Sequence, residues 1–112
     1  MELSSKTEEQ LHIVSVHGSR IDAAVALEFK DAMRTKTDSG PEQVILDLSA
    51  VEFIDSSGLG AIVAAMKNLS GDRKLALAGL TPTVEKVFRL TRMDTVFQVF
   101  TTLDGALEEL RP

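Results

Sequence analysis

The sequence predicts an α/β fold in which a mixed β-sheet has a mainly parallel core. Two strand-like segments at the start are followed by segments that alternate between helical and strand-like character. Strands that alternate with helices pair in parallel, because each helix carries the chain back across the sheet. The run V-I-L-D-L at residues 44–48 is nearly all apolar, which is typical of a strand covered on both faces. The length of 112 residues fits one domain with one core.

Each element is predicted from a local pattern, and about four of the elements are helices. Asp22 is predicted to be the N-cap of the first helix, and Thr81-Pro82 opens a later one, with proline in the first turn. In order, the predicted elements are a polar edge strand at residues 2–6 antiparallel to a strand at 11–17, a helix at 23–37, a strand at 44–48, a helix that follows Asp55 and ends before the turn at 70–73, a strand at 74–78, a helix from 81–82, a strand at 96–100 and a helix at 103–110. The turns after the parallel strands are expected to gather at one edge of the sheet, where such folds bind ligands and partners.

The composition excludes several classes of function. The net charge is −5 and the basic residues are scattered, which argues against a nucleic-acid partner. The chain contains no cysteine, so neither a disulfide framework nor thiol chemistry is expected. No apolar run has the length of a membrane span, and the polar start does not resemble a secretion signal. The sequence therefore indicates a cytoplasmic domain without a membrane partner.

The helix that follows the turn Asp55-Ser56-Ser57-Gly58 has two different faces. Its apolar stripe comprises Leu59, Ile62, Val63, Met66 and Leu69. The opposite face carries small or uncharged residues, namely Ser57, Gly60, Ala61, Ala64 and Asn68. Such a face suits close approach by another protein, and it equally suits a helix buried on both faces within the domain. The composition of the helix leaves both interpretations open.

Catalytic and ligand-binding interpretations of the same turn are weak. A serine hydrolase motif needs a glycine before the serine and a partnering histidine, and both histidines lie in one early strand. The pair Gly58 and Gly60 is followed by Val63 where a phosphate-binding fingerprint has its third glycine. Asp22, Asp47 and Asp55 would be the candidates for a metal site. Helix capping explains Asp22 and Asp55, so no metal is expected.

A serine at a helix N-terminus is a suitable place for a phosphate group. Backbone amides and the positive end of the helix dipole favour negative charge at this position. Phosphorylation adds roughly −1.5 to −2 charge at neutral pH. On the rim of the small-residue face, this group would exclude a docked partner by bulk and by charge. The other interpretation is that Ser56 and Ser57 are only capping residues.

The segment V-E-F-I-D-S-S-G-L-G-A-I-V closely resembles the signature of STAS domains, specifically of the single-domain bacterial anti-sigma factor antagonists. The resemblance covers nearly the whole chain. It includes the Ile21-Asp22 step, the V-I-L-D-L strand, the Thr81-Pro82-x-Val84 helix opening and residues 90–97. Many STAS domains lack a phosphorylatable serine in this motif, so D-S-S-G-L-G is a specific feature.

This resemblance implies a partner switch rather than an enzyme, and it implies no cofactor. In the family, the unphosphorylated antagonist binds an anti-sigma factor that is also a serine kinase of the GHKL type, and the sigma factor is released. The kinase phosphorylates the serine that corresponds to Ser56, which dissociates the pair, and a PP2C-type phosphatase restores binding. Ser57 is a minor alternative site. The residues expected at the partner surface are Asp22, Asp55, Ser56, Ser57, Gly58, Gly60, Ala61 and Ala64.

One loop departs from the family pattern. The family usually has Gly-Glu-Leu/Ile-Asp before the first helix, whereas this chain has Gly18-Ser19-Arg20-Ile21-Asp22. The loop is one residue longer, and Ser-Arg stands in place of the acid.

Two alternative functions are a STAS scaffolding module in which Ser56 is not phosphorylated, and a small nucleotide-binding or hydrolytic domain that uses Gly58 and Gly60.

Overall fold

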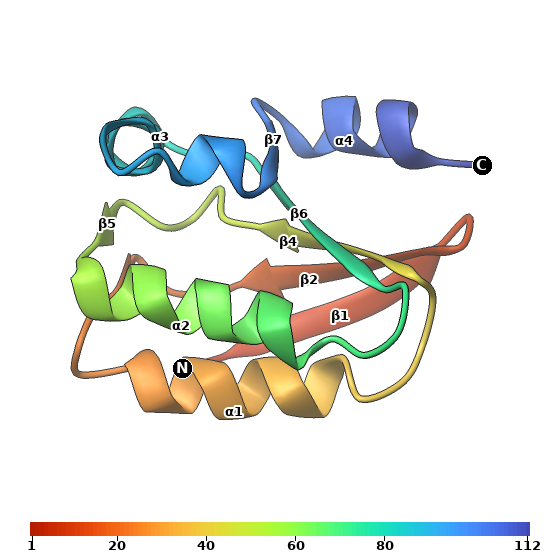
Figure 1. Ribbon diagram of the computed structural model, residues 1–112, viewed down its shortest axis with the longest axis horizontal. Coiled ribbons are helices and arrows are strands. Elements are labelled where there is room, and N and C mark those ends of the chain that lie inside the picture. Colours follow the sequence, from red (N-terminus) through yellow and green to blue (C-terminus); the bar gives the residue numbers. More distant parts are fainter.

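A five-stranded sheet forms the centre of the computed structural model, which describes residues 1–112 (Figure 1). The order of its strands is β1-β2-β4-β6-β7. The edge strand β1 is antiparallel to β2, and the other neighbouring pairs are parallel, which confirms the predicted mixed sheet. The strands are β1 (Leu3–Glu8), β2 (Leu11–Val16), β4 (Gln43–Asp47), β6 (Lys74–Ala78) and β7 (Gln98–Phe100).

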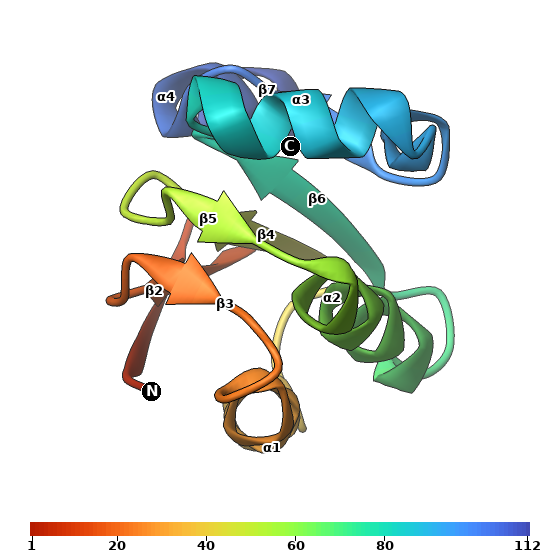
Figure 2. The same ribbon diagram turned by 90° about the vertical axis from the view of Figure 1, so that its left-hand side faces the viewer.

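Helices cover both faces of this sheet, and four α-helices are present as expected. On one face α1 (Ala26–Lys36) and α2 (Ser56–Asn68) lie side by side (Figure 1). On the other face lies α4 (Leu103–Leu110). The helix α3 (Pro82–Leu90) packs against a short 3-10 helix (Met93–Thr95) and against the segment that precedes α2 (Figure 2). None of the helices combines the length and the apolar character that crossing a membrane requires.

The alternation of side chains along β4 explains why its sequence is apolar throughout. Val44 and Leu46 belong to a core cluster of 19 buried residues beneath α1 and α2. Ile45 points the other way, into a cluster of four buried residues that includes Ala106 of α4. Both faces of the strand are therefore covered, as the sequence predicts.

A second, two-stranded sheet was not predicted. The segments β3 (Arg20–Ile21) and β5 (Phe53–Ile54) pair in parallel, although the sequence suggested loops on both sides. Two residues are too few to show an alternating pattern, so only the folded chain reveals this pairing. The small sheet is important because β5 leads directly into α2, and β3 leads into the turn before α1 (Figure 2).

The start of α1 differs from the prediction. The helix begins at Ala26, and its N-cap is Val25 rather than Asp22. Asp22 instead organises a turn, in which its carbonyl accepts from Val25 N at 3.0 Å and its carboxylate accepts from Ala24 N at 3.1 Å. A short acidic side chain stabilises such a turn as readily as a helix end, which is why the sequence did not distinguish the two. Smaller differences are that β1 continues to Glu8 and that β7 starts only at residue 98.

The loops after β4 and β6 meet at the carboxyl edge of the sheet, as predicted. Thr81 occupies the N-cap position of α3, but its hydroxyl donates to the carbonyl of Val51 at 2.8 Å instead of capping the helix. The backbone amide of Leu48 donates to the carbonyl of Ala78 at 2.9 Å. These hydrogen bonds join the two loops, so the segment that leads from β4 to α2 is held in position.

Arg73 connects the segments that follow the C-terminal ends of α1 and α2. It lies in the turn that follows α2, and its guanidinium donates to three carbonyls of the loop that follows α1. The Nε group donates to Pro41 at 3.2 Å, one terminal amino group donates to Ser39 at 3.4 Å, and the other donates to Thr37. A single side chain therefore holds the loop between α1 and β4 in place.

Candidate functional site

Asp55 shapes the turn between β5 and α2. It is the N-cap of α2, and its Oδ1 atom accepts from the backbone amide of Gly58 at 2.8 Å. Its Oδ2 atom accepts from the amide of Ala23 at 3.1 Å, so the same carboxylate also binds the turn before α1. The bond from Gly58 is the main cause that lowers the pKa of the Asp55 carboxyl; desolvation opposes it, and the bond from Ala23 adds to the lowering. Asp55 is therefore a structural anion that joins the N-terminal ends of α1 and α2.

Both serines of the motif are accessible. Ser56 and Ser57 are the first two residues of α2, and both are exposed. Neither hydroxyl takes the capping position, because Asp55 occupies it. The hydroxyl of Ser56 is therefore not used to cap the helix, and it is accessible to a modifying enzyme. The interpretation of Ser56 as only a capping residue does not describe this structure.

Gly58 is buried and has a packing role. A Cβ atom placed on it would lie 1.9 Å from the carbonyl oxygen of Ile21 in β3. No side chain fits in that space, so glycine allows α2 to begin directly against the small sheet. Its amide is also bonded to Asp55, which means that this amide is not available to a phosphate group.

The small-residue face of α2 divides between the interior and the surface. Ala61 is only 2% exposed and belongs to the main buried cluster. Gly58 is therefore not part of the accessible surface that the sequence suggested, and Ala61 contributes almost no exposed area to it. Gly60 is exposed, and a Cβ atom added to it would have no other atom within 4 Å, while Ala64 is half-buried.

The buried face of α2 also differs from the predicted apolar stripe. Its buried residues are Gly58, Ala61, Ile62 and Ala65. Only Ile62 belongs to the predicted stripe, whose other members are half-buried at the margin of the core. The helix contacts both the small sheet and α1. Its buried face therefore includes small residues, which permit close contact between the two helices.

A groove of about 390 Å³ lies between α1 and α2, and Ser57 is one of the residues that line it. Leu27 of α1 contributes an apolar side chain that is 67% exposed, and Lys30 lies one turn further along. The groove is lined by Ala23, Ala26, Leu27, Lys30, Ser57, Gly60 and Ala61. Only the packing of α1 on α2 brings Leu27 and Ser57 to the same groove.

A cation and an aromatic ring lie opposite each other on β3 and β5, the two short strands that lead toward this site. The guanidinium carbon of Arg20 lies 5.2 Å from the ring centroid of Phe53, across the β3–β5 pair. The Nε atom of Arg20 also lies 2.8 Å from Oδ2 of Asp22. Phe53 is 44% exposed, and sequence reasoning did not identify it as part of the site.

The geometry does not support the nucleotide-binding alternative, because a nucleotide phosphate at this turn would meet the carboxylates of Asp22 and Asp55 while the amide of Gly58 is already used. No three histidine, aspartate or glutamate side chains gather closely enough to hold a metal ion.

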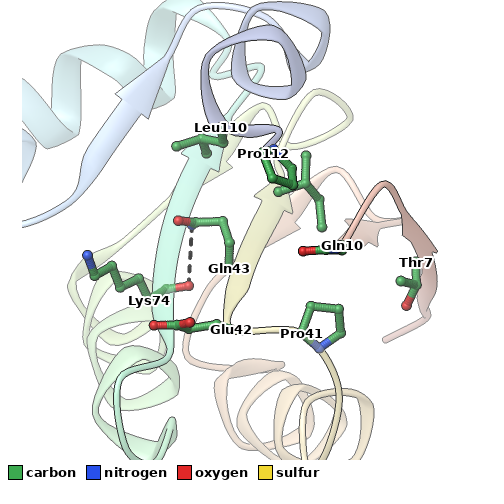
Figure 3. Close-up of a pocket in the computed structure, with 9 residues that line it drawn as sticks. Thr7, Gln10, Pro41, Glu42, Gln43, Lys74, Leu110 and Pro112 are labelled. Atoms are coloured by element: carbon green, nitrogen blue, oxygen red, sulfur yellow. Dashed lines mark hydrogen bonds between the residues drawn. The ribbon is translucent and has the colours of Figure 1, made fainter.

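The largest hollow, of about 600 Å³, lies at the other end of the sheet, where Gln43 and Lys74 begin β4 and β6 (Figure 3). None of the predicted site residues lines it.

The fold and the site define a small α/β domain that presents an exposed serine at the start of a helix beside the ends of a parallel sheet. The chain belongs to the STAS domain family, whose model matches residues 2–106. This finding confirms the resemblance that the sequence motif showed.

Named relatives and solved structures agree with this assignment. The chain is 29% identical over 94 residues to the anti-sigma-F factor antagonist RsfB of Mycobacterium tuberculosis, which covers 84% of this chain and 77% of RsfB. The crystal structure of an anti-sigma factor antagonist from Mycobacterium paratuberculosis has a TM-score of 0.87 and 29% identity, covering 99% of this chain and 94% of that chain. The phosphorylated form of the Bacillus cell fate determinant SpoIIAA shares the fold, with a TM-score of 0.67 and 18% identity, covering 98% of this chain and 100% of that chain.

Proposed function

We propose that this protein is an anti-sigma factor antagonist that acts by partner switching and is controlled by phosphorylation of Ser56. In its unphosphorylated form it binds an anti-sigma factor, which is also a serine kinase of the GHKL type, and the sigma factor is released. Phosphorylation of Ser56 ends this binding, and a PP2C-type phosphatase restores it. The chain itself performs no catalysis in this scheme, and the exchange takes place in the cytoplasm.

The observation that carries this proposal is the accessibility of Ser56. It is exposed at the first position of α2, while Asp55 supplies the helix cap in its place. A kinase can therefore reach the hydroxyl without unfolding the turn. Ser57 is also exposed and remains a minor alternative site. The names of the relatives support the same class of function, because RsfB is an anti-sigma-F factor antagonist.

The proposed partner surface combines the serines with the groove between α1 and α2. Leu27 offers exposed apolar area, and the open surface at Gly60 lets a partner approach the helix backbone closely. Asp22, Asp55 and Ala64 border this surface. An unmodified Ser56 adds little bulk at its edge, whereas a phosphate there adds both bulk and roughly −1.5 to −2 charge. A partner seated on the groove would then be repelled, which is the physical basis of the switch.

The test is phosphorylation by the serine kinase that is encoded nearest to this protein, followed by intact mass measurement and mapping of the modified residue. We expect one added phosphate on the wild-type protein and on Ser57→Ala, and none on Ser56→Ala. The kinase should retain Ser56→Ala in a complex in the presence of ATP and release the wild-type protein. Full phosphorylation of Ser56→Ala would show that the site is wrong. A stable complex without any phosphorylation of the wild-type protein would support the scaffolding alternative instead.

A further inference from the structure

The fold uses only part of the guanidinium group of Arg20. Its Nε atom pairs with Asp22 at 2.8 Å, and one face lies over the ring of Phe53. The two terminal amino groups have no hydrogen-bond partner in the structure, and the side chain is 62% exposed. Arginine presents its donors as a planar fork that matches the oxygens of a carboxylate or phosphate. The outer edge of this fork is therefore available to an oxyanion.

A phosphate on Ser56 would need such a cation, because the turn does little to neutralise it. Asp55 precedes Ser56 directly, and its own carboxylate already accepts from the amide of Gly58. Asp22 adds a second carboxylate, since the turn that it organises is bonded to Asp55 through the amide of Ala23. The positive end of the helix dipole is thus largely satisfied by Asp55 before any phosphate is added.

The small sheet brings Arg20 to the same end of the domain as Ser56. Arg20 lies opposite Phe53 and Ile21 lies opposite Ile54 in a parallel register, so both segments run toward the site together. Ser56 follows Phe53 by three residues, which is at most about 10 Å of extended chain. An arginine side chain and a phosphoserine side chain can bridge this separation between them. The other cation at the site, Lys30, lines the groove on the α1 side, next to Ser57.

We propose that Arg20 binds the phosphate group of phosphorylated Ser56 within the same molecule. This inference rests on the proposed phosphorylation of Ser56. The terminal amino groups of Arg20 donate to the phosphate oxygens, and the side chain turns away from Asp22 toward the doubly charged group. Phosphorylation then changes the partner surface twice, because it adds an anion at Ser56 and withdraws a cation from the area around Phe53.

The experiment uses the full chain with the phosphate placed on Ser56 by genetic encoding of phosphoserine, so no kinase is involved. Phosphorus NMR then follows the second ionisation of the phosphate with pH. A neighbouring cation favours the dianion, so Arg20→Gln should raise the second pKa of the phosphate by about 0.5 unit. Arg20→Lys should preserve most of the wild-type value. Arg89→Gln, which removes an exposed arginine from an ion pair with Glu85 on α3, should leave the value unchanged.

A second readout separates direct contact from a general charge effect. The Nε–H resonance of Arg20 should shift when the wild-type protein carries the phosphate, relative to the unmodified protein. An unchanged phosphate pKa in Arg20→Gln, or an unmoved Arg20 resonance, would overturn the proposal. A raised pKa in Lys30→Gln without one in Arg20→Gln would overturn it as well and would assign the phosphate to Lys30. Because the phosphate is installed without a kinase, none of these results depends on whether a kinase modifies Ser56.

Discussion

Two glycines in the first turns of α2 provide a matched pair of substitutions with opposite expected effects. A Cβ atom on Gly58 would lie 1.9 Å from the carbonyl oxygen of Ile21, whereas a Cβ atom on Gly60 would meet nothing within 4 Å. Both residues have ordinary helical backbone angles, because neither has a positive φ. Alanine at either position gains the same helix propensity, about 1 kcal/mol over glycine. The difference between the two variants therefore measures the close contact of α2 with β3.

The cost at Gly58 can be worked out from the contacts that must be broken. The Ile21 carbonyl cannot remain in place, and forced overpacking of this kind costs about 1–3 kcal/mol. Moving it also weakens the bond that it accepts from the amide of Asp55, worth about 1 kcal/mol. After subtracting the gain in helix propensity, Gly58→Ala should lower the free energy of unfolding by about 2 kcal/mol. Gly60→Ala should raise it by about 1 kcal/mol.

The assay is thermal and urea unfolding followed by far-UV circular dichroism, since the chain has no tryptophan or tyrosine for fluorescence. At about 4 °C per kcal/mol for a domain of this size, the Tm should fall by about 8 °C in Gly58→Ala and rise by about 4 °C in Gly60→Ala. The slope of the free energy against urea should not change. Equal effects of the two substitutions, or a neutral Gly58→Ala, would refute the packing argument.

Three further predictions concern binding and pH. Ser56→Asp should leave the Tm within a few degrees, because Ser56 is exposed and does not cap the helix. The added charge should weaken partner binding by roughly tenfold or more in a calorimetric titration, and unchanged affinity would contradict charge exclusion. Leu27→Ala should change the free energy of unfolding by no more than about 0.5 kcal/mol and should weaken the partner complex. Leu90→Ala, which alters a similarly exposed leucine on α3, should change neither stability nor binding. If both substitutions weaken binding equally, the groove is not part of the interface. Burial is the main cause that lowers the pKa of His12 below 6.5, and the nearby Arg73 lowers it further. Stability should therefore decrease as the pH falls below 6.5, and His12→Gln should reduce this loss. A pH profile that is the same in wild type and His12→Gln would show that the buried imidazole is not responsible.

The main sheet could be predicted because its features are local in the sequence. The run V-I-L-D-L has an apolar residue for each of two cores, and the structure places Val44 and Leu46 in one and Ile45 in the other. The position of Asp55 at the start of α2 also followed from the sequence, because aspartate is a favoured capping residue. The close contact of Gly58 with Ile21 did not, because it joins segments distant in the chain.

The predictions that differ from the structure depend on contacts between distant segments. Ala61 was expected at the partner surface, but a small residue suits burial equally well, and Ala61 is 2% exposed. The pairing of Arg20 with Phe53 joins residues on two strands of two residues each, which no periodicity shows. Propensity and spacing describe each helix and strand separately, and this site is formed where several of them meet.

The hydrogen bonds at both ends of α1 and α2 have a consequence for how quickly the protein can change state. Asp55 joins the helices near Ser56, and Arg73 joins their far ends through the loop carbonyls. Neither helix can slide or rotate on the other without breaking one of these connections. The effect of a modification at Ser56 should therefore stay local, and the backbones of the modified and unmodified proteins should superpose closely. Under the proposed phosphorylation of Ser56, we therefore expect no refolding step between the two forms, and we expect the kinase and the phosphatase to set the rate of the switch.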